Sequence, residues 1–304
     1  MIDRSYVASN VPRVERQCRN ITGMLVACCL SGCRTPQEGD SATQRAGAAG
    51  SPSAASEAGA TVGKGRNTAN SQSVLPPLSG HEWLETLELG SGHQAVVAIP
   101  LGAREPRPVV VGVHGAGDRA EWACGGYRNA TGAHAFIICP QGLPRGDGKF
   151  STASVERLAK DIELAVQKTR EAFGAYVASG PPTYSGFSLG AIRGVHVVAP
   201  QGKEFPRVLL VEGGARELSP RSVESFVATG GERVLLLCAA ARCDESLHSA
   251  ARAIERKGAR ARVVAAGTGR HNLDGTMMRR IAQNWAWLVE GDPRWASWSP
   301  PADL

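Results

Sequence analysis

The sequence predicts a three-layer α/β domain, in which helices cover both faces of a mostly parallel sheet. Short, continuous apolar runs recur at wide spacing, as expected for strands buried on both faces. Between them, apolar residues recur at steps of three and four, which is typical of amphipathic helices. The chain of 304 residues, 42% of them hydrophobic, is long enough to bury a core of this size. This alternation of strand and helix favours one α/β domain over residues 77–304.

The individual elements follow in order along that region. Residues 83–100 alternate about a Gly-Ser-Gly turn and predict a hairpin. The predicted buried strands span residues 109–113, 135–139, 208–211, 234–239 and 262–266, and the predicted helices span 154–173, 245–257 and 276–289. The interval between the strands at 208 and 234 has room for one helix, so no large cap domain is expected there.

Residues 1–32 have the organisation of an export signal. Arg16 and Arg19 precede an apolar stretch at 21–30, which is too short to span a bilayer but has the length of a signal-peptide core. Leu-Ser-Gly-Cys follows at 30–33. This arrangement resembles the lipobox of bacterial lipoproteins, which implies cleavage before Cys33 and lipid attachment to its sulfur. The alternative is a buried or interfacial helix that ends in cysteine.

Residues 33–76 are predicted to be a disordered tether. Ala, Gly, Ser and Thr dominate this stretch, so it cannot bury enough apolar surface to fold. A flexible tether after a lipid anchor would hold a soluble domain off the membrane. The expected location is therefore outside the cytoplasm, anchored to a bacterial membrane.

The stretch Gly-Phe-Ser-Leu-Gly at 186–190 singles out Ser188. An extended segment precedes it and a helical one follows, so the serine is expected on a sharp turn at a helix N-terminus. That geometry exposes the hydroxyl as a nucleophile. The alternative is that Ser188 is a small residue in a tight turn.

Three motifs together resemble the α/β-hydrolase family, and more loosely its small esterases and dienelactone-hydrolase-like members. They are VVVGVHGAGD at 109–118, GFSLG at 186–190 and GTGRHNLDG at 267–275. The resemblance covers about residues 80–290 and implies a catalytic triad in the order serine, acid, histidine. Ser188, Asp244 and His271 keep that order. The alternative for His271 is a solvated loop histidine.

The acid has more than one candidate. Asp244 follows a predicted strand and is favoured, but it also precedes a helix and could be only its N-cap. Glu245 is adjacent. Glu212 ends the preceding strand, where some members of the family carry the acid, and is the alternative.

The resemblance also implies the remaining parts of the site. The oxyanion donors would be the backbone N–H groups of Leu189 and of Ala116 or its neighbour. In the family, the residues that follow the strand at 109–113 bind the oxyanion through backbone N–H groups. The His114 side chain is therefore expected to be structural. No metal or other cofactor is expected. Trp122, Tyr127 and Phe150 are candidate pocket walls, with core packing as their alternative.

Four cysteines follow Cys33, and their spacing does not fit a zinc site. Cys124 and Cys139 are both expected at the carboxyl edge of the sheet, and Cys238 and Cys243 would close a small loop. An exported protein can keep disulfides, so the pairs Cys124–Cys139 and Cys238–Cys243 are predicted. Free buried thiols are the alternative.

The leading hypothesis is a membrane-tethered serine hydrolase that cleaves small or chain-end carboxylic esters. The alternatives are a peptidase or acyltransferase on the same fold, or a surface lipoprotein that only binds a ligand. The formal net charge of +6 comes from arginines scattered among acidic residues, which disfavours nucleic-acid binding. A monomer is expected.

The anchor is tested by Cys33→Ala. Several acyl chains on one cysteine give durable membrane binding, so the parent should fractionate with membranes and incorporate a labelled fatty acid. The variant should lose the label and move to the soluble fraction. Equal fractionation of the two proteins, with no label in either, would contradict lipidation.

Overall fold

The computed structural model describes residues 75–302 of the chain. The predicted signal peptide at 1–32, the predicted lipidation site Cys33 and nearly all of the predicted tether at 33–76 lie outside the described residues. Among residues 75–302, no helix combines the length and the apolar character needed to cross a bilayer.

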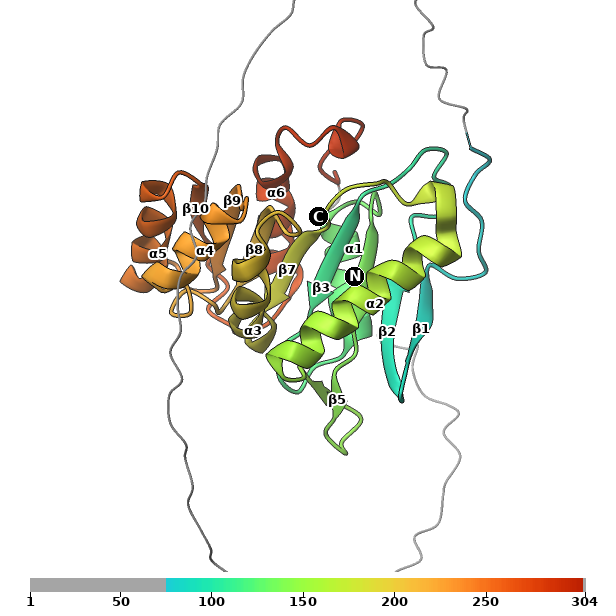
Figure 1. Ribbon diagram of the computed structural model, residues 1–304, viewed down its shortest axis with the longest axis horizontal. Helices are drawn as coiled ribbons and strands as arrows, with labels where there is room; N and C mark the ends of the chain where they lie inside the picture. Colours follow the sequence, from blue (N-terminus) through green and yellow to red (C-terminus); the bar gives the residue numbers. More distant parts are fainter. Residues whose placement is uncertain (1–74, 303–304) are drawn as a thin grey trace, which may run out of the picture. The chain divides into compact units, whose positions relative to one another are not determined.

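The centre of the domain is an eight-stranded sheet in the order β1-β2-β4-β3-β7-β8-β9-β10 (Figure 1). Its strands are β1 (Leu84–Gly90), β2 (His93–Ala98), β3 (Val109–Val113), β4 (Phe136–Pro140), β7 (Thr183–Phe187), β8 (Arg207–Val211), β9 (Arg233–Cys238) and β10 (Arg260–Ala265). The strands from β4 to β10 in this order pair in parallel, and β1 and β2 form an antiparallel hairpin. The predicted hairpin and the five predicted strands are therefore confirmed, to within two residues at their ends.

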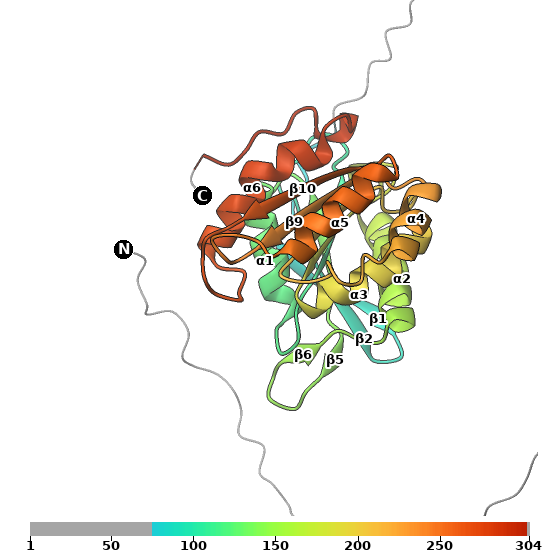
Figure 2. The ribbon, with the colours of Figure 1, turned by 90° about the vertical axis from the view of Figure 1, so that its left-hand side faces the viewer.

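Helices cover both faces of the sheet (Figure 2). On one face lie α1 (Ala120–Ala130) and α6 (Gly275–Val289). On the other face lie α2 (Val155–Phe173), α3 (Leu189–Val198), α4 (Pro220–Ala228) and α5 (Glu245–Arg256). Short 3-10 turns occur at Gly174–Tyr176, Ala199–Gln201 and Pro293–Trp295. The predicted three-layer α/β architecture is confirmed.

The two faces bury separate hydrophobic clusters because the central strands are apolar on both sides. In β8, for example, Leu210 belongs to the cluster under α3 and α4, whereas Leu209 belongs to the cluster under α6. Burial on both faces removes the alternation that an exposed sheet face would leave in the sequence. This is why the continuous apolar runs predicted the strands correctly.

Between β8 and β9 the chain forms α4 alone, which confirms that no cap domain is inserted there. One small feature was not predicted. β5 (Leu143–Pro144) and β6 (Phe150–Ser151) form a two-stranded hairpin that extends from the lower edge of the sheet in Figure 1. Two-residue strands are too short to produce a periodic pattern in the sequence.

Both predicted disulfides are present. Cys124 in α1 is joined to Cys139 in β4, with the Cα atoms 5.9 Å apart. Cys238 at the end of β9 is joined to Cys243, with the Cα atoms 5.6 Å apart. The first bond ties a helix to the sheet, and the second closes the short loop that leads into α5.

Tryptophans attach the last helix and the tail to the domain. Trp285 in α6 is fully buried and contacts Trp295 edge-on, at 5.5 Å between ring centroids. Trp295 in turn contacts Trp298, whose indole N–H donates to the Thr131 carbonyl at 2.8 Å.

We expect Trp285→Ala to lower the free energy of unfolding by about 3–5 kcal/mol, because it leaves a large cavity beneath α6. Trp122→Ala is the matched control, since the Trp122 side chain is 59% exposed. It should change stability by less than about 0.5 kcal/mol. Urea titration with the disulfides intact measures both values, and equal losses would contradict this account of the core.

Candidate active site

Ser188 occupies a sharp turn between the end of β7 and the start of α3. Its φ is 51° and its ψ is −117°, a conformation that non-glycine residues rarely adopt. The Ser188 N–H donates to the Val211 carbonyl at the end of β8, at 2.8 Å. The turn therefore lies at the carboxyl edge of the sheet, with the hydroxyl at a helix N-terminus.

The flanking glycines are needed because the backbones approach one another closely. A Cβ atom on Gly190 would lie 2.4 Å from the Val113 carbonyl oxygen, and one on Gly186 would lie 2.7 Å from the Gly190 carbonyl oxygen. Both contacts involve backbone atoms that cannot move aside. The pattern around Ser188 is thus a packing requirement of the turn.

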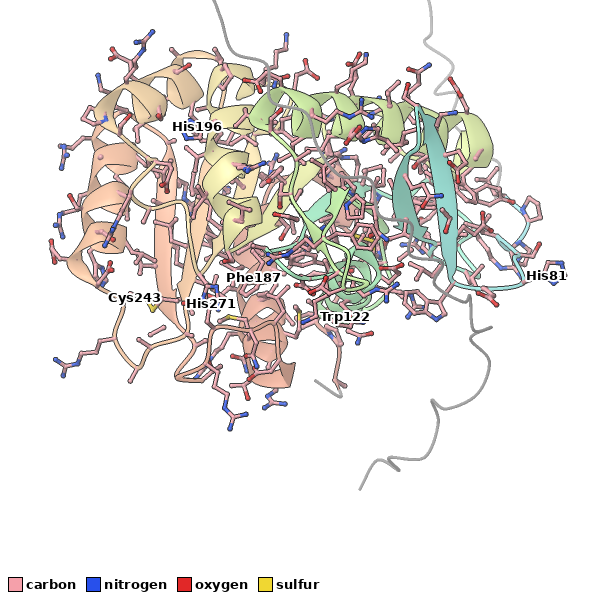
Figure 3. All side chains as sticks on the ribbon, turned by 90° about the horizontal axis from the view of Figure 1, so that it is seen from below. His81, Trp122, Phe187, His196, Cys243 and His271 are labelled. Carbon is pink, nitrogen blue, oxygen red and sulfur yellow. A yellow bond between two sulfur atoms is a disulfide. The ribbon has the colours of Figure 1, made fainter. Side chains whose placement is uncertain are left out.

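His271 lies against Ser188 from the loop that follows β10. Its Nε2 atom is 2.8 Å from the Ser188 hydroxyl, and its Nδ1 atom is 2.9 Å from a carboxylate oxygen of Glu212. The ring also packs on Phe187, with 5.0 Å between ring centroids. Figure 3 views the domain from below and shows His271 beside Phe187, with Cys243 nearby. Serine, histidine and carboxylate form one continuous chain of hydrogen bonds.

Glu212 is positioned by the neighbouring strand. It directly follows β8 and has a φ of 57°, and its N–H donates to the Leu237 carbonyl at 2.9 Å. The second oxygen of its carboxylate accepts from the N–H of Ala239, just after β9. The side chain is 17% exposed, whereas that of His271 is 55% exposed.

The prediction that Asp244 is the partner of His271 is wrong. The Asp244 carboxylate instead caps α5, accepting from the N–H groups of Ser246 at 3.0 Å and Leu247 at 3.3 Å. The first N–H groups of a helix lack partners within it, so an aspartate directly before a helix is attracted to them. Glu212, the alternative acid, holds the histidine.

The loops that carry these groups are hydrogen-bonded to each other. The N–H of Gly269 donates to the Ala239 carbonyl at 2.9 Å, and that of Ala266 donates to the Cys238 carbonyl at 2.8 Å. The loop before His271 therefore rests on the loop that the Cys238–Cys243 disulfide closes. Because backbone N–H groups carry no side-chain signature, sequence reasoning missed the role of Ala239.

The predicted oxyanion loop follows β3. The His114 side chain is fully buried, and its ring nitrogens lie 2.7 Å from the Gly115 carbonyl and 2.9 Å from that of Gln141. Among residues 75–302, the N–H groups of Ala116 and Leu189 have no hydrogen-bond acceptor. They are available to a substrate oxygen, and their role as oxyanion donors stays a prediction.

The three candidate pocket-wall residues differ in their burial. Tyr127 lies in α1 and is fully buried under β3, where a Cβ on Gly112 would be 2.7 Å from its ring, so its packing alternative is the correct one. Burial raises the pKa of its phenol above the ordinary range. Trp122, also in α1, is exposed and lies on the same edge as His271 in Figure 3. Phe150 in β6 is half-buried, and its carbonyl accepts from the N–H of Gly117 at 2.8 Å.

The sequence matches no known protein-family model and no curated protein. Comparison with solved structures shows similarity to Est1E from Butyrivibrio proteoclasticus, with 11% identity over 68% of this chain and 99% of that one and a TM-score of 0.51. FphF, a fluorophosphonate-binding serine hydrolase of Staphylococcus aureus, gives 13% identity over 70% and 99% and a TM-score of 0.50. At these identities the likeness concerns the fold. The chain has the α/β-hydrolase fold expected from its motifs.

The capping role of Asp244 makes a prediction about stability. The pKa of its carboxyl is lowered from the ordinary 3.8, first by the Ser246 hydroxyl, then by the N–H groups of Leu247 and Ser246 and by Arg216. A lowered pKa in the folded state stabilises the protein above pH 3.8, and this stabilisation is lost as the pH falls through the folded-state pKa.

We therefore expect Asp244→Ala to cost about 1 kcal/mol of unfolding free energy at pH 7, with the difference from the parent shrinking in acid. Asp244→Asn is the matched control, because asparagine also caps helices well. Denaturant titrations at neutral and acidic pH measure the effect. An Asp244→Ala variant as stable as the parent at pH 7 would contradict the capping role.

Proposed function

We propose that the protein is a serine hydrolase that cleaves carboxylic esters through an acyl-enzyme. One observation carries the proposal: the hydrogen-bonded chain from Ser188 through His271 to Glu212, at 2.8 Å and 2.9 Å. The strained turn places its serine at the N-terminus of α3. Similarity of fold to solved hydrolases agrees with the proposal and does not replace this geometry.

The first step activates the serine. A free hydroxyl is a poor nucleophile at neutral pH, so His271 Nε2 accepts the Ser188 proton as the oxygen attacks the ester carbonyl. The Glu212 carboxylate accepts from Nδ1–H, which selects the productive tautomer and stabilises the imidazolium that forms. The N–H of Ala239 holds that carboxylate in place.

The tetrahedral intermediate carries a negative oxygen that needs donors. The free N–H groups of Leu189 and Ala116 would supply them, with the positive end of the α3 dipole beside the charge. When the carbon–oxygen bond to the alcohol breaks, the alcohol takes the proton from His271. Water then attacks the acyl-enzyme and gives a proton to His271. When the bond from the acyl carbon to the Ser188 oxygen breaks, that oxygen takes the proton from His271 and the acid leaves.

The surroundings of the site favour small or chain-end esters. Only α4 lies between β8 and β9, and more than half of the His271 side chain is exposed. Such a site offers little apolar enclosure for a long acyl chain. The same hydrogen-bonded chain serves peptidases and acyltransferases, but free access of water to the acyl-enzyme favours hydrolysis over transfer. The two disulfides fit an oxidising compartment, which agrees with the proposed export and membrane anchor.

The proposal is tested by the rate of short-chain nitrophenyl ester hydrolysis. Ser188→Ala removes the nucleophile and should lower kcat on the order of 10⁶-fold. Glu212→Gln, which loses the charge beside His271, should lower kcat by about 10⁴-fold. Asp244→Asn keeps the helix cap and should stay within about threefold of the parent, because Asp244 does not contact His271.

These outcomes separate the enzyme from its alternatives. Full activity in Ser188→Ala would refute the proposed nucleophile. A large loss of kcat in Asp244→Asn, together with a small loss in Glu212→Gln, would show that Asp244 is the acid of the triad. A folded parent that hydrolyses no ester would favour a ligand-binding protein.

A further inference from the structure

A pocket of about 660 Å³ opens beside the triad, on the side of His271 and Glu212. The loops that follow β8, β9 and β10 form most of its wall, and the end of β9, the start of α5 and Ile192 of α3 contribute the rest. Ser188, Leu189 and Ala116 are not among its lining residues. The pocket therefore lies beyond the histidine and away from the proposed oxyanion donors.

Each of the three loops brings one arginine to this pocket. Arg216 follows β8, Arg242 follows β9 and Arg270 follows β10, directly before His271. None of the three guanidinium groups has an ion pair or side-chain hydrogen bond within residues 75–302. Some other arginines of the domain do have such a partner, as in Arg294 with Asp292 at 2.6 Å and Arg233 with Glu290 at 2.8 Å.

Two carboxylates besides Glu212 line the pocket, Asp244 and Glu217. One oxygen of the Asp244 carboxylate, Oδ1, accepts from the first N–H groups of α5. Glu217 has no hydrogen bond or ion pair within the described part of the chain. No carboxylate of the described residues forms an ion pair or hydrogen bond with these three guanidinium groups. Arg216 acts on Asp244 only at longer range, where its charge helps to lower the pKa of that carboxyl. Three guanidinium groups without a direct partner thus share one pocket, an arrangement suited to binding oxygen anions.

The chemistry of the proposed reaction says which part of a substrate meets this pocket. His271 gives its proton to the departing oxygen, so the leaving alcohol must lie on the histidine side when the ester bond breaks. The acyl carbon stays at Ser188, near Leu189 and Ala116. A pocket that contacts His271 and not those residues is placed to hold the alcohol part.

We propose that this pocket selects esters whose alcohol part carries an anionic oxygen group, such as a carboxylate. This inference rests on the proposed function and names its substrate class. The Ser188 oxygen forms the new bond to the acyl carbon, the bond from that carbon to the alcohol oxygen breaks, and the alcohol leaves with the proton from His271. Its carboxylate stays ionised throughout, beside Arg216, Arg242 and Arg270.

The test compares matched esters that differ only in this charge. Para-acetoxybenzoate and the longer para-acetoxyphenylpropionate are measured beside their methyl esters, and each pair gives a ratio of kcat/KM, anionic over neutral. In Arg216→Gln/Arg242→Gln/Arg270→Gln we expect that ratio to fall at least about tenfold from the parent value for one or both pairs. Comparing ratios removes the intrinsic reactivity of each ester.

The control carries the same change of net charge elsewhere. Arg104, Arg221 and Arg256 are exposed, lie outside the pocket and have no side-chain partner among residues 75–302. Arg104→Gln/Arg221→Gln/Arg256→Gln should keep the parent ratio. Added salt should lower the ratio in the parent and leave it unchanged in the pocket triple variant, since salt screens exposed charges.

Equal ratios in the parent and the pocket triple variant would overturn the inference while leaving the hydrolase intact, because the methyl esters report the chemistry alone. A ratio that falls equally in the control would also overturn it. The mono-para-nitrophenyl ester of glutaric acid, beside its methyl ester, places the charge on the acyl side. If only this pair responds to the pocket arginines, the assignment to the alcohol is wrong. Absence of turnover of every ester refutes the proposed function, and the inference fails with it.

Discussion

The backbone conformation of Ser188 is the constraint on which the site depends. A non-glycine residue at a φ of 51° is strained, typically by about 1–3 kcal/mol, and persists only where its surroundings determine it. Here contacts with β3 and β8 fix the backbone of Ser188. Gly190 lets α3 approach the Val113 carbonyl at the end of β3, and the Val211 carbonyl at the end of β8 accepts from the Ser188 N–H. The same contacts expose the hydroxyl at the helix N-terminus. Strain and function therefore have one cause, the close packing of α3 on buried parallel strands.

The other groups of the site lie at the ends of three neighbouring strands, which follow one another in the sequence. β8 ends in Glu212, β9 ends beside the N–H that holds Glu212, and the loop after β10 supplies His271. Because parallel strands end at the same edge, residues far apart in the sequence meet without any long excursion of the chain. The disulfide after β9 closes the loop on which the histidine loop rests. The site is thus assembled on rigid elements, which preorganises it for catalysis.

The sequence predicted most of this arrangement where the signal is local. Continuous apolar runs identified the strands, and the glycines about Ser188 identified the turn. The acid of the triad was harder to predict, because Asp244 follows β9 and Glu212 follows β8. Only the three-dimensional contacts distinguish a helix cap from the partner of His271. Tyr127 was equally ambiguous, since aromatic side chains serve both pockets and cores. The convergence of Arg216, Arg242 and Arg270 has no sequence signature, because each lies alone on its own loop.

In the proposed reaction, Ser188 attacks a substrate carbonyl while the N–H groups of Leu189 and Ala116 bind the resulting oxyanion. A crystal structure of the protein after reaction with a fluorophosphonate tests it most directly, because the phosphonyl group mimics the tetrahedral intermediate. We expect a covalent bond to the Ser188 oxygen, with the phosphonyl oxygen about 2.7–3.1 Å from both backbone nitrogens. An unmodified Ser188, or an adduct whose oxygen points away from these two groups, would contradict it.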